Sequence, residues 1–298
     1  MTLVPPNMLS PAPRSESRPR DDELDLYGVT HRGLVREENE DHFLLCTVHP
    51  QVLVHATSLP EPSELTLGGQ RLATIMLVAD GVGGGAAGSR ASRIATEAVT
   101  RYVASSLRCY HTAAPYAEGE FEETLRAAAL EAHETVRSEA AAQPAERGMA
   151  TTLSLAIVVW PWMYVIQVGD SRCYLYQGST LRQLTRDQTF AQDLVEQGVF
   201  TREDAKVSPL NNMLSSAIGS DEALPEITRV DVRERGCVIF LCTDGLTKHV
   251  PDVEIADHLA SMESAEQVCS ALLTLALDRG GTDNITLVVG RALKRGED

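Results

Sequence analysis

Aspartates stand at the ends of several apolar runs in this 298-residue chain, beside glycine or asparagine. An aspartate after one strand is usually a turn residue, because its side chain bonds the nearby backbone. Several of them favour another interpretation, since strand ends gather at one rim of a fold and carboxylates crowded there repel one another unless a cation lies between them. Oxygen ligands suit Mg²⁺ or Mn²⁺, so the pattern predicts a site for more than one metal ion. The residues are Asp80 after 75–79, Gly169-Asp170 after 163–168, Asp244 after 237–242, and Asp283-Asn284 before 285–289.

The stretch 33–41 places one arginine, Arg36, among acidic and amide side chains. It could be a solvated charged turn. In a functional interpretation, Glu40 and Asp41 offer carboxylates to metal ions or to their waters. Arg36 then offers the planar fork that a guanidinium presents to a phosphoryl group.

The composition is that of an ordinary globular protein, with 43% hydrophobic and 23% charged residues. The net charge of −16 argues against nucleic acid and against an anionic membrane surface as partners. The six cysteines form no CxxC pair, so we expect buried free thiols and a cytoplasmic protein. No signal peptide or membrane-spanning segment is expected, and nothing indicates an oligomer, so we expect a monomer.

The order of the predicted elements indicates the fold class. Residues 1–22 carry five prolines and predict a disordered leader before a single domain at 23–298. Within the domain, strands at 24–30, 43–48 and 151–184 and helices at 86–107 and 121–142 do not alternate one for one. This order favours an α+β fold with antiparallel sheets and helices packed on their outer faces, rather than a doubly wound parallel sheet.

Six short motifs occur in an order that resembles the PPM family, the type 2C metal-dependent protein serine/threonine phosphatases, and the bacterial branch in particular. The resemblance covers about residues 24–292 and implies a β-sandwich of two antiparallel sheets flanked by helix pairs, in four layers. The motifs are Arg36-x-x-Asn39-Glu40-Asp41, Asp80-Gly81-Val82-Gly83-Gly84, Gly148-Met149-Ala150-Thr151-Thr152, Val168-Gly169-Asp170-Ser171-Arg172, Thr243-Asp244-Gly245-Leu246 and Asp283-Asn284-Ile285-Thr286.

The resemblance also implies a set of ligands for two Mn²⁺ or Mg²⁺ ions. Asp80 would bridge the two ions, and the carbonyl of Gly81 would complete a ligand set. Glu40 or Asp41 would serve one ion, directly or through water.

The remaining implied roles fall on the other motifs. Asp244 and Asp283 would hold the second ion, with Asn284 in support. Asp170 would bind a weaker third ion, and Asp244 would be a ligand of that ion as well. Arg36 would bind the substrate phosphate, so that Arg36, Asp80 and Asp244 form the catalytic core.

The implied reaction is hydrolysis of phosphoserine and phosphothreonine in proteins that serine/threonine kinases phosphorylate. A water that bridges two ions loses its proton more readily and attacks phosphorus directly. No Cys-x5-Arg loop indicates a covalent route. Val82 and Gly85 stand where some members carry histidine, and residues 198–219 match the position of the variable flap.

Two other functions stay open at this point. A catalytically weak pseudophosphatase would keep the fold and bind phosphoproteins as a regulatory module. A two-metal phosphoesterase would act on small molecules or nucleic acid, although the acidic composition disfavours the nucleic-acid version.

Overall fold

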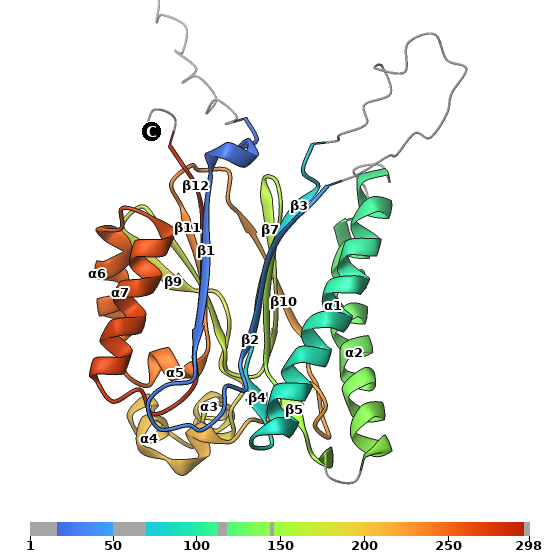
Figure 1. Cartoon of the computed structure of the whole chain (residues 1–298), viewed down its shortest axis with the longest axis vertical. Coiled ribbons are helices and arrows are strands. Elements are labelled where there is room, and N and C mark those ends of the chain that lie inside the picture. The colour runs from blue at the N-terminus through green and yellow to red at the C-terminus, as the bar shows by residue number, and fades with distance from the viewer. Residues whose placement is uncertain (1–16, 50–69, 113–117, 144–145, 295–298) are drawn as a thin grey trace, which may run out of the picture.

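The computed structural model describes residues 17–49, 70–112, 118–143 and 146–294. Two five-stranded antiparallel sheets lie face to face in the middle of the molecule, and a pair of helices covers each outer face (Figure 1). The predicted four-layer α+β sandwich is therefore confirmed.

The first sheet has the strand order β1-β12-β11-β8-β9, and the second has β10-β7-β6-β3-β2. A short ribbon of β4 and β5 lies beside the end of the second sheet. The strands are β1 (Leu24–His31), β2 (His42–Val48), β3 (Ala73–Ala79), β4 (Gly81–Val82), β5 (Ala150–Thr151), β6 (Leu153–Val159), β7 (Trp162–Val168), β8 (Arg172–Gln177), β9 (Thr180–Gln183), β10 (Glu226–Asp231), β11 (Val238–Cys242) and β12 (Ile285–Ala292).

The central strands are continuous apolar runs because both of their faces are covered. Along β3, Met76 and Val78 point into the core between the two sheets. Ile75 and Leu77 point the other way, into the core beneath the helices. This alternation follows from the two-residue period of a strand, and it explains why no polar face interrupts the run.

The long helix pair on the second sheet is α1 and α2, and the pair on the first sheet is α6 and α7 (Figure 1). Helix α1 continues past the predicted end at residue 107. Short helices cluster at the lower end of the molecule in Figure 1. The helices are η1 (Asp21–Glu23), α1 (Ala86–Thr112), α2 (Glu118–Ala142), α3 (Phe190–Glu196), α4 (Arg202–Val207), η4 (Pro209–Asn212), α5 (Asp244–Thr247), α6 (Asp252–Ala260) and α7 (Ala265–Asp278).

The region predicted as a flap, 198–219, contains α4 and η4. A reciprocal capping box begins α4, in which the Thr201 hydroxyl accepts from the Asp204 N–H and the Asp204 carboxylate accepts from the Thr201 N–H. The polar composition of residues 206–222 predicts a loop. Local capping gives part of this segment regular structure instead, because Ser208 caps η4.

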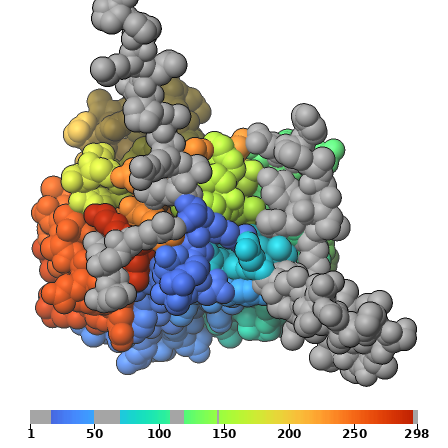
Figure 2. All heavy atoms as spheres, turned by 90° about the horizontal axis from the view of Figure 1, so that it is seen from above, coloured from blue at the N-terminus to red at the C-terminus, as the bar shows by residue number. Residues whose placement is uncertain are grey.

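The end of the molecule opposite to these short helices carries the start of β1 and the end of β12 (Figure 2). The predicted leader lies outside the described residues as far as residue 16. Residues 17–22 do have defined positions, because the buried Arg71 side chain bonds Asp21 and the carbonyl of Pro19, the latter at 2.9 Å. The structured part therefore begins before the boundary that composition predicts.

The prolines and glycines of residues 49–71 predict a hairpin or surface insertion, and residues 50–69 of this stretch lie outside the described residues. Cys46, Cys173, Cys237, Cys242 and Cys269 are free thiols, and four of them are buried. Among the described residues, no helix combines the length and the apolarity needed to cross a lipid bilayer.

Candidate active site

A cleft of about 810 Å³ opens at the end of the sandwich where the short helices cluster. The loop between β1 and β2, the turn after β3, the N-terminal end of α5 and the segment after η4 all contribute to its walls. Most sequence-predicted site residues line it: Arg36, Glu40, Asp80, Gly81, Asp170, Asp244, Asp283 and Asn284. The structure thus brings together carboxylates that lie up to about 240 positions apart in the sequence, as the strand-end argument predicts.

Asp41 is the most deeply buried of the candidate carboxylates, with only 3% of its surface exposed. Its Oδ2 accepts hydrogen bonds from the hydroxyls of Thr243 at 2.8 Å and Thr286 at 2.7 Å. Its Oδ1 is buried with no partner. Burial, opposed by the two threonine hydroxyls and reinforced by the charges of Asp244 and Asp283, raises the pKa of Asp41 to about 7.

The pKa values of Asp80 and Asp170 are also raised, for the same physical reasons as that of Asp41. Desolvation, followed by the charges of Asp41 and Asp244, raises the pKa of Asp80 well above its ordinary value. Desolvation, followed by the charges of Asp244 and Asp187, raises the pKa of Asp170 in the same way. Such shifts mean that these carboxylates repel one another and that a cation between them would be stabilised.

Two threonines fix the backbone of Asp80. Thr152 Oγ1 accepts the Asp80 N–H at 2.9 Å, and Thr151 Oγ1 donates to the Asp80 carbonyl at 2.8 Å. The Thr152 hydroxyl also bonds the Ser171 hydroxyl at 2.6 Å, which ties the Asp80 turn to the turn that carries Asp170. Both threonines belong to the motif at 148–152, but the motif alone did not indicate that they hold the Asp80 backbone.

Glu40 lines the cleft and also bonds the N-terminal end of α1. Its Oε1 accepts the backbone N–H of Gly85 at 2.7 Å, and its carbonyl accepts the Ser92 hydroxyl at 2.5 Å. A carboxylate is stabilised at a helix N-terminus by the helix dipole. The helix packs so closely that a Cβ on Gly88 would lie 1.8 Å from Glu40 Oε2. Asp41 Oδ1 is buried without a partner, whereas Glu40 lines the cleft and bonds the start of α1, so both carboxylates stay candidates for metal binding, direct or through water.

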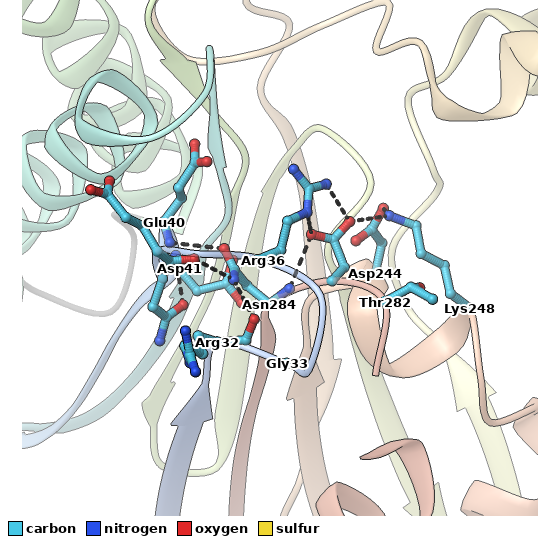
Figure 3. A network of polar contacts seen from close by, with 12 residues as sticks. Arg32, Gly33, Arg36, Glu40, Asp41, Asp244, Lys248, Thr282 and Asn284 are labelled. Atoms are coloured by element: carbon cyan, nitrogen blue, oxygen red, sulfur yellow. Dashed lines mark hydrogen bonds and ion pairs between the residues drawn. The ribbon is translucent and has the colours of Figure 1, made fainter. Parts of the chain in front are cut away.

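Asn284 joins the β1–β2 loop to the start of β12. Its Oδ1 accepts the Glu40 N–H at 2.8 Å, and its Nδ2 donates to the carbonyls of Arg32 and Glu38, each at 2.9 Å. The side chain is 4% exposed, so these bonds are shielded from water. Figure 3 shows Asn284 beneath the loop that carries Arg36, Glu40 and Asp41.

Asp283 is held between two cations. Arg36 binds it through both oxygens, at 2.8 Å from Nε to Oδ1 and 2.9 Å from Nη2 to Oδ2. Lys248 Nζ lies 2.7 Å from the same Oδ2 and 2.6 Å from Asp244 Oδ2 (Figure 3). Burial alone would raise the pKa of Asp283, but the bonds and charges of Lys248 and Arg36 outweigh it and lower that pKa. The sequence analysis did not foresee Lys248.

The donor set of the cleft fits hard divalent cations. It consists of oxygen, and two of its atoms, Asp41 Oδ1 and Asp244 Oδ1, are buried without any hydrogen-bond partner. Burying such atoms unpaired is costly, which favours a cation as their partner. As the side chains stand, however, no three acidic, histidine or cysteine groups in the described part of the chain enclose an ion by themselves. The ion pairs of Asp283 with Arg36 and Lys248 account for this, because they occupy oxygens that an ion would need.

The two positions where some type 2C phosphatases carry histidine hold no ionisable group here, and one of them, Val82, lines the cleft. Val82 is 40% exposed, and Gly85 bonds Glu40. No histidine is among the described residues that line the cleft. On the flap side, the wall is formed by residues including Met213, Ser215 and Asp221.

Comparison with known proteins gives a consistent result. A family model described as protein phosphatase 2C matches residues 66–278. A serine/threonine phosphatase from Listeria welshimeri is 35% identical over 226 residues, which cover 75% of this chain and 87% of that protein.

Solved structures agree with this match. A serine/threonine phosphatase of Mycobacterium tuberculosis, PstP, superposes with a TM-score of 0.71 at 28% identity and covers 91% of this chain and 99% of that one. The catalytic domain of PstP in complex with two manganese ions superposes with a TM-score of 0.68 at 26% identity, with 91% and 99% of the two chains covered.

Proposed function

Because the chain belongs to the protein phosphatase 2C family of metal-dependent protein serine/threonine phosphatases, we propose that it hydrolyses phosphoserine and phosphothreonine in proteins. The observation that carries the proposal is the crowding of Asp41, Asp80, Asp170 and Asp244 around one cleft, with raised pKa values and two unpartnered oxygens. A carboxylate cluster of this kind is unfavourable unless cations bind it. The pseudophosphatase alternative has no comparable support, since the sequence retains every carboxylate that the resemblance implies for the site.

The ligands of two divalent ions would come from the set predicted by the resemblance. Asp80 would serve both ions, together with the carbonyl of Gly81. Glu40 or Asp41 would serve one ion, directly or through water, and Asp244 and Asp283 the other. When bound, the ions supply an activated water and neutralise charge on the phosphoryl oxygens.

Oxygen ligands of this kind bind both Mn²⁺ and Mg²⁺, so we propose one of these two ions as the cofactor.

The protein's own residues position the substrate. Arg36 is half exposed. Its Nε and Nη2 bond Asp283, and its Nη1 takes no part in these two bonds. We assign the substrate phosphate to this guanidinium, because a planar fork binds phosphoryl oxygens well. Thr151 and Thr152 fix the Asp80 turn, and Asn284 fixes the Arg36 loop, so both groups meet the substrate in set positions.

Asp170 offers a place for a third ion. The charge of Asp244 repels its carboxylate, and the family resemblance implies that Asp170 lies outside the ligand set of the first two ions. We expect Asp170→Ala to leave two ions bound, as counted by calorimetry, while peptide turnover falls at least tenfold. Wild-type turnover in that variant would remove Asp170 from the site.

Free buried thiols suit a reducing compartment, so we place the protein's activity in the cytoplasm. Its substrates would be phosphoproteins made by serine/threonine kinases. We expect no role for nucleic acid and no obligatory second copy.

The test is hydrolysis of a phosphothreonine peptide by the purified protein with Mn²⁺, after EDTA, and after Mn²⁺ is restored. We expect loss of activity with EDTA and its recovery. Asp80→Ala should lower kcat by roughly 10²-fold or more, because it removes charge that stabilises the transition state through the ions. Asp231→Ala, at the far end of β10, is the control and should keep full activity. Full activity after exhaustive chelation would rule out the metal mechanism.

A further inference from the structure

Lys248 places a positive charge inside the carboxylate cluster. Its ammonium lies 2.6 Å from Asp244 Oδ2 and 2.7 Å from Asp283 Oδ2, so one side chain joins two carboxylates. The side chain is 33% exposed and lines the cleft. Figure 3 shows Lys248 beside Asp244, with Arg36 on the other side of the group.

The position of Lys248 follows from the short helix α5. Asp244 is the first residue of this helix and Lys248 follows it by one turn, with the Lys248 N–H bonded to the Asp244 carbonyl at 2.9 Å. Residues four apart lie on the same helix face, so the ammonium is tethered beside the aspartate. An exposed lysine elsewhere would not be held in this way.

Lys248 binds the two carboxylates that are assigned above to one divalent cation. Asp244 Oδ2 and Asp283 Oδ2 both accept from its Nζ, while Arg36 binds both oxygens of Asp283. An ammonium and a divalent ion at the same pair of carboxylates repel each other and compete for the same negative charge. Each therefore weakens the binding of the other at this pair.

We propose that Lys248 is a built-in competitor of the divalent cation at the Asp244–Asp283 pair. It neutralises and holds these carboxylates when no ion is bound, and it must swing away when an ion binds. The inference rests on the metal site of the proposed function. Because the Lys248 ammonium already lies at this pair, the chain binds the metal more weakly than the same carboxylates would without Lys248.

The first test measures metal binding directly. Wild type, Lys248→Met and Lys206→Met are titrated with Mn²⁺ by calorimetry. Lys206 is an exposed residue of α4, so it controls for loss of one lysine charge. Each partly exposed ion pair weakens Mn²⁺ binding by about threefold, so breaking both pairs should strengthen it roughly tenfold.

We expect Lys248→Met to bind one Mn²⁺ on the order of tenfold more tightly than wild type, and Lys206→Met to match wild type. Lys248→Arg, which keeps the charge, should stay closer to wild type than the methionine variant. Equal or weaker Mn²⁺ binding by a folded Lys248→Met would overturn the proposal. Absence of Mn²⁺ binding by wild type would instead refute the metal site itself, so the two failures are distinguishable.

A second test needs no variant. The chain has only three lysines, Lys206, Lys248 and Lys294. Acylation of their amines by an activated ester, with and without saturating Mg²⁺, is followed by mass spectrometry. Lys248 should react several-fold faster with Mg²⁺ bound, because it has lost its carboxylate partners, while the other two keep their rates. An unchanged or lower reactivity of Lys248 in saturating Mg²⁺ would refute the displacement.

Discussion

The buried carboxylate of Asp41 should cost stability whenever no metal ion is bound, and replacing it with asparagine should recover that stability. Its pKa is raised to about 7, against roughly 3.9 in an unfolded chain. The difference of about 3 units corresponds to roughly 4 kcal/mol of unfolding free energy lost on ionisation. The amide would leave its NH₂ group unpartnered where Oδ1 now lies, at a cost of about 1–3 kcal/mol, so a net gain of about 2 kcal/mol remains.

The sign of the pH dependence follows from linkage. Folded Asp41 holds its proton more tightly than the unfolded chain does, so its contribution to stability is full below about pH 4 and is lost as the pH rises through about 7. The advantage of Asp41→Asn should therefore be absent near pH 4, grow between pH 4 and 7, and stay constant above pH 7.

Thermal unfolding in EDTA across this pH range measures the effect. At pH 8 we expect Asp41→Asn to melt about 5 °C above wild type, from roughly 2–4 °C per kcal/mol. Adding Mn²⁺ should stabilise wild type more than the variant, because ligand binding to the folded state adds stability and the variant has lost one metal ligand.

Asp204→Asn is the matched control. Hydrogen bonds from Thr201 lower the pKa of Asp204, so this variant should lose stability above the ordinary aspartate pKa rather than gain it. A destabilised Asp41→Asn at pH 8, or a difference from wild type that does not vary with pH, would refute the reasoning.

Three further changes test the framework of the site. Asn284→Ala should lower the unfolding free energy by at least about 2 kcal/mol and reduce turnover, since three buried hydrogen bonds to the β1–β2 loop are lost. Unfolding in urea measures the first effect and peptide assays the second, and unchanged values would contradict this role of Asn284. Gly88→Ala should destabilise the protein because its Cβ would overlap Glu40, whereas Gly119→Ala meets no atom within 4 Å and should not; equal melting temperatures would contradict this packing. Removing residues 1–16 should leave peptide phosphatase activity within about twofold, because a segment of this composition buries little apolar surface; a large, salt-sensitive change would show that it acts on the cleft.

Much of the fold followed from local patterns in the sequence. Continuous apolar runs such as Ala73–Ala79 predicted strands buried on both faces, and the uneven spacing of helices excluded a parallel sheet. The spacing Thr201-x-x-Asp204 predicts a capping box and a short helix, and the structure has both at the start of α4, because such bonds are local. The start of the structured chain was placed too late, because the contacts of Asp21 with Arg71 join residues 50 positions apart and leave no local pattern.

Part of the candidate site was predictable from the sequence, because an aspartate at the end of an apolar strand can be recognised without the structure. Asp80, Asp170, Asp244 and Asp283 all reach the cleft. The division of labour between Glu40 and Asp41 was not predictable, because it depends on which carboxylate meets the N-terminus of α1. Lys248 was missed for a similar reason, since its role depends on the single turn of α5 and on the distant Asp283.

The central claim is that bound divalent ions in the carboxylate cluster drive phosphate hydrolysis. The most direct measurement is a parallel Mn²⁺ titration of one preparation, in which calorimetry counts bound ions and a phosphothreonine peptide reports turnover at each concentration. The account predicts at least two bound ions and a rate that rises as the second one binds. Turnover that is already complete without bound Mn²⁺, or ion binding with no effect on the rate, would contradict it.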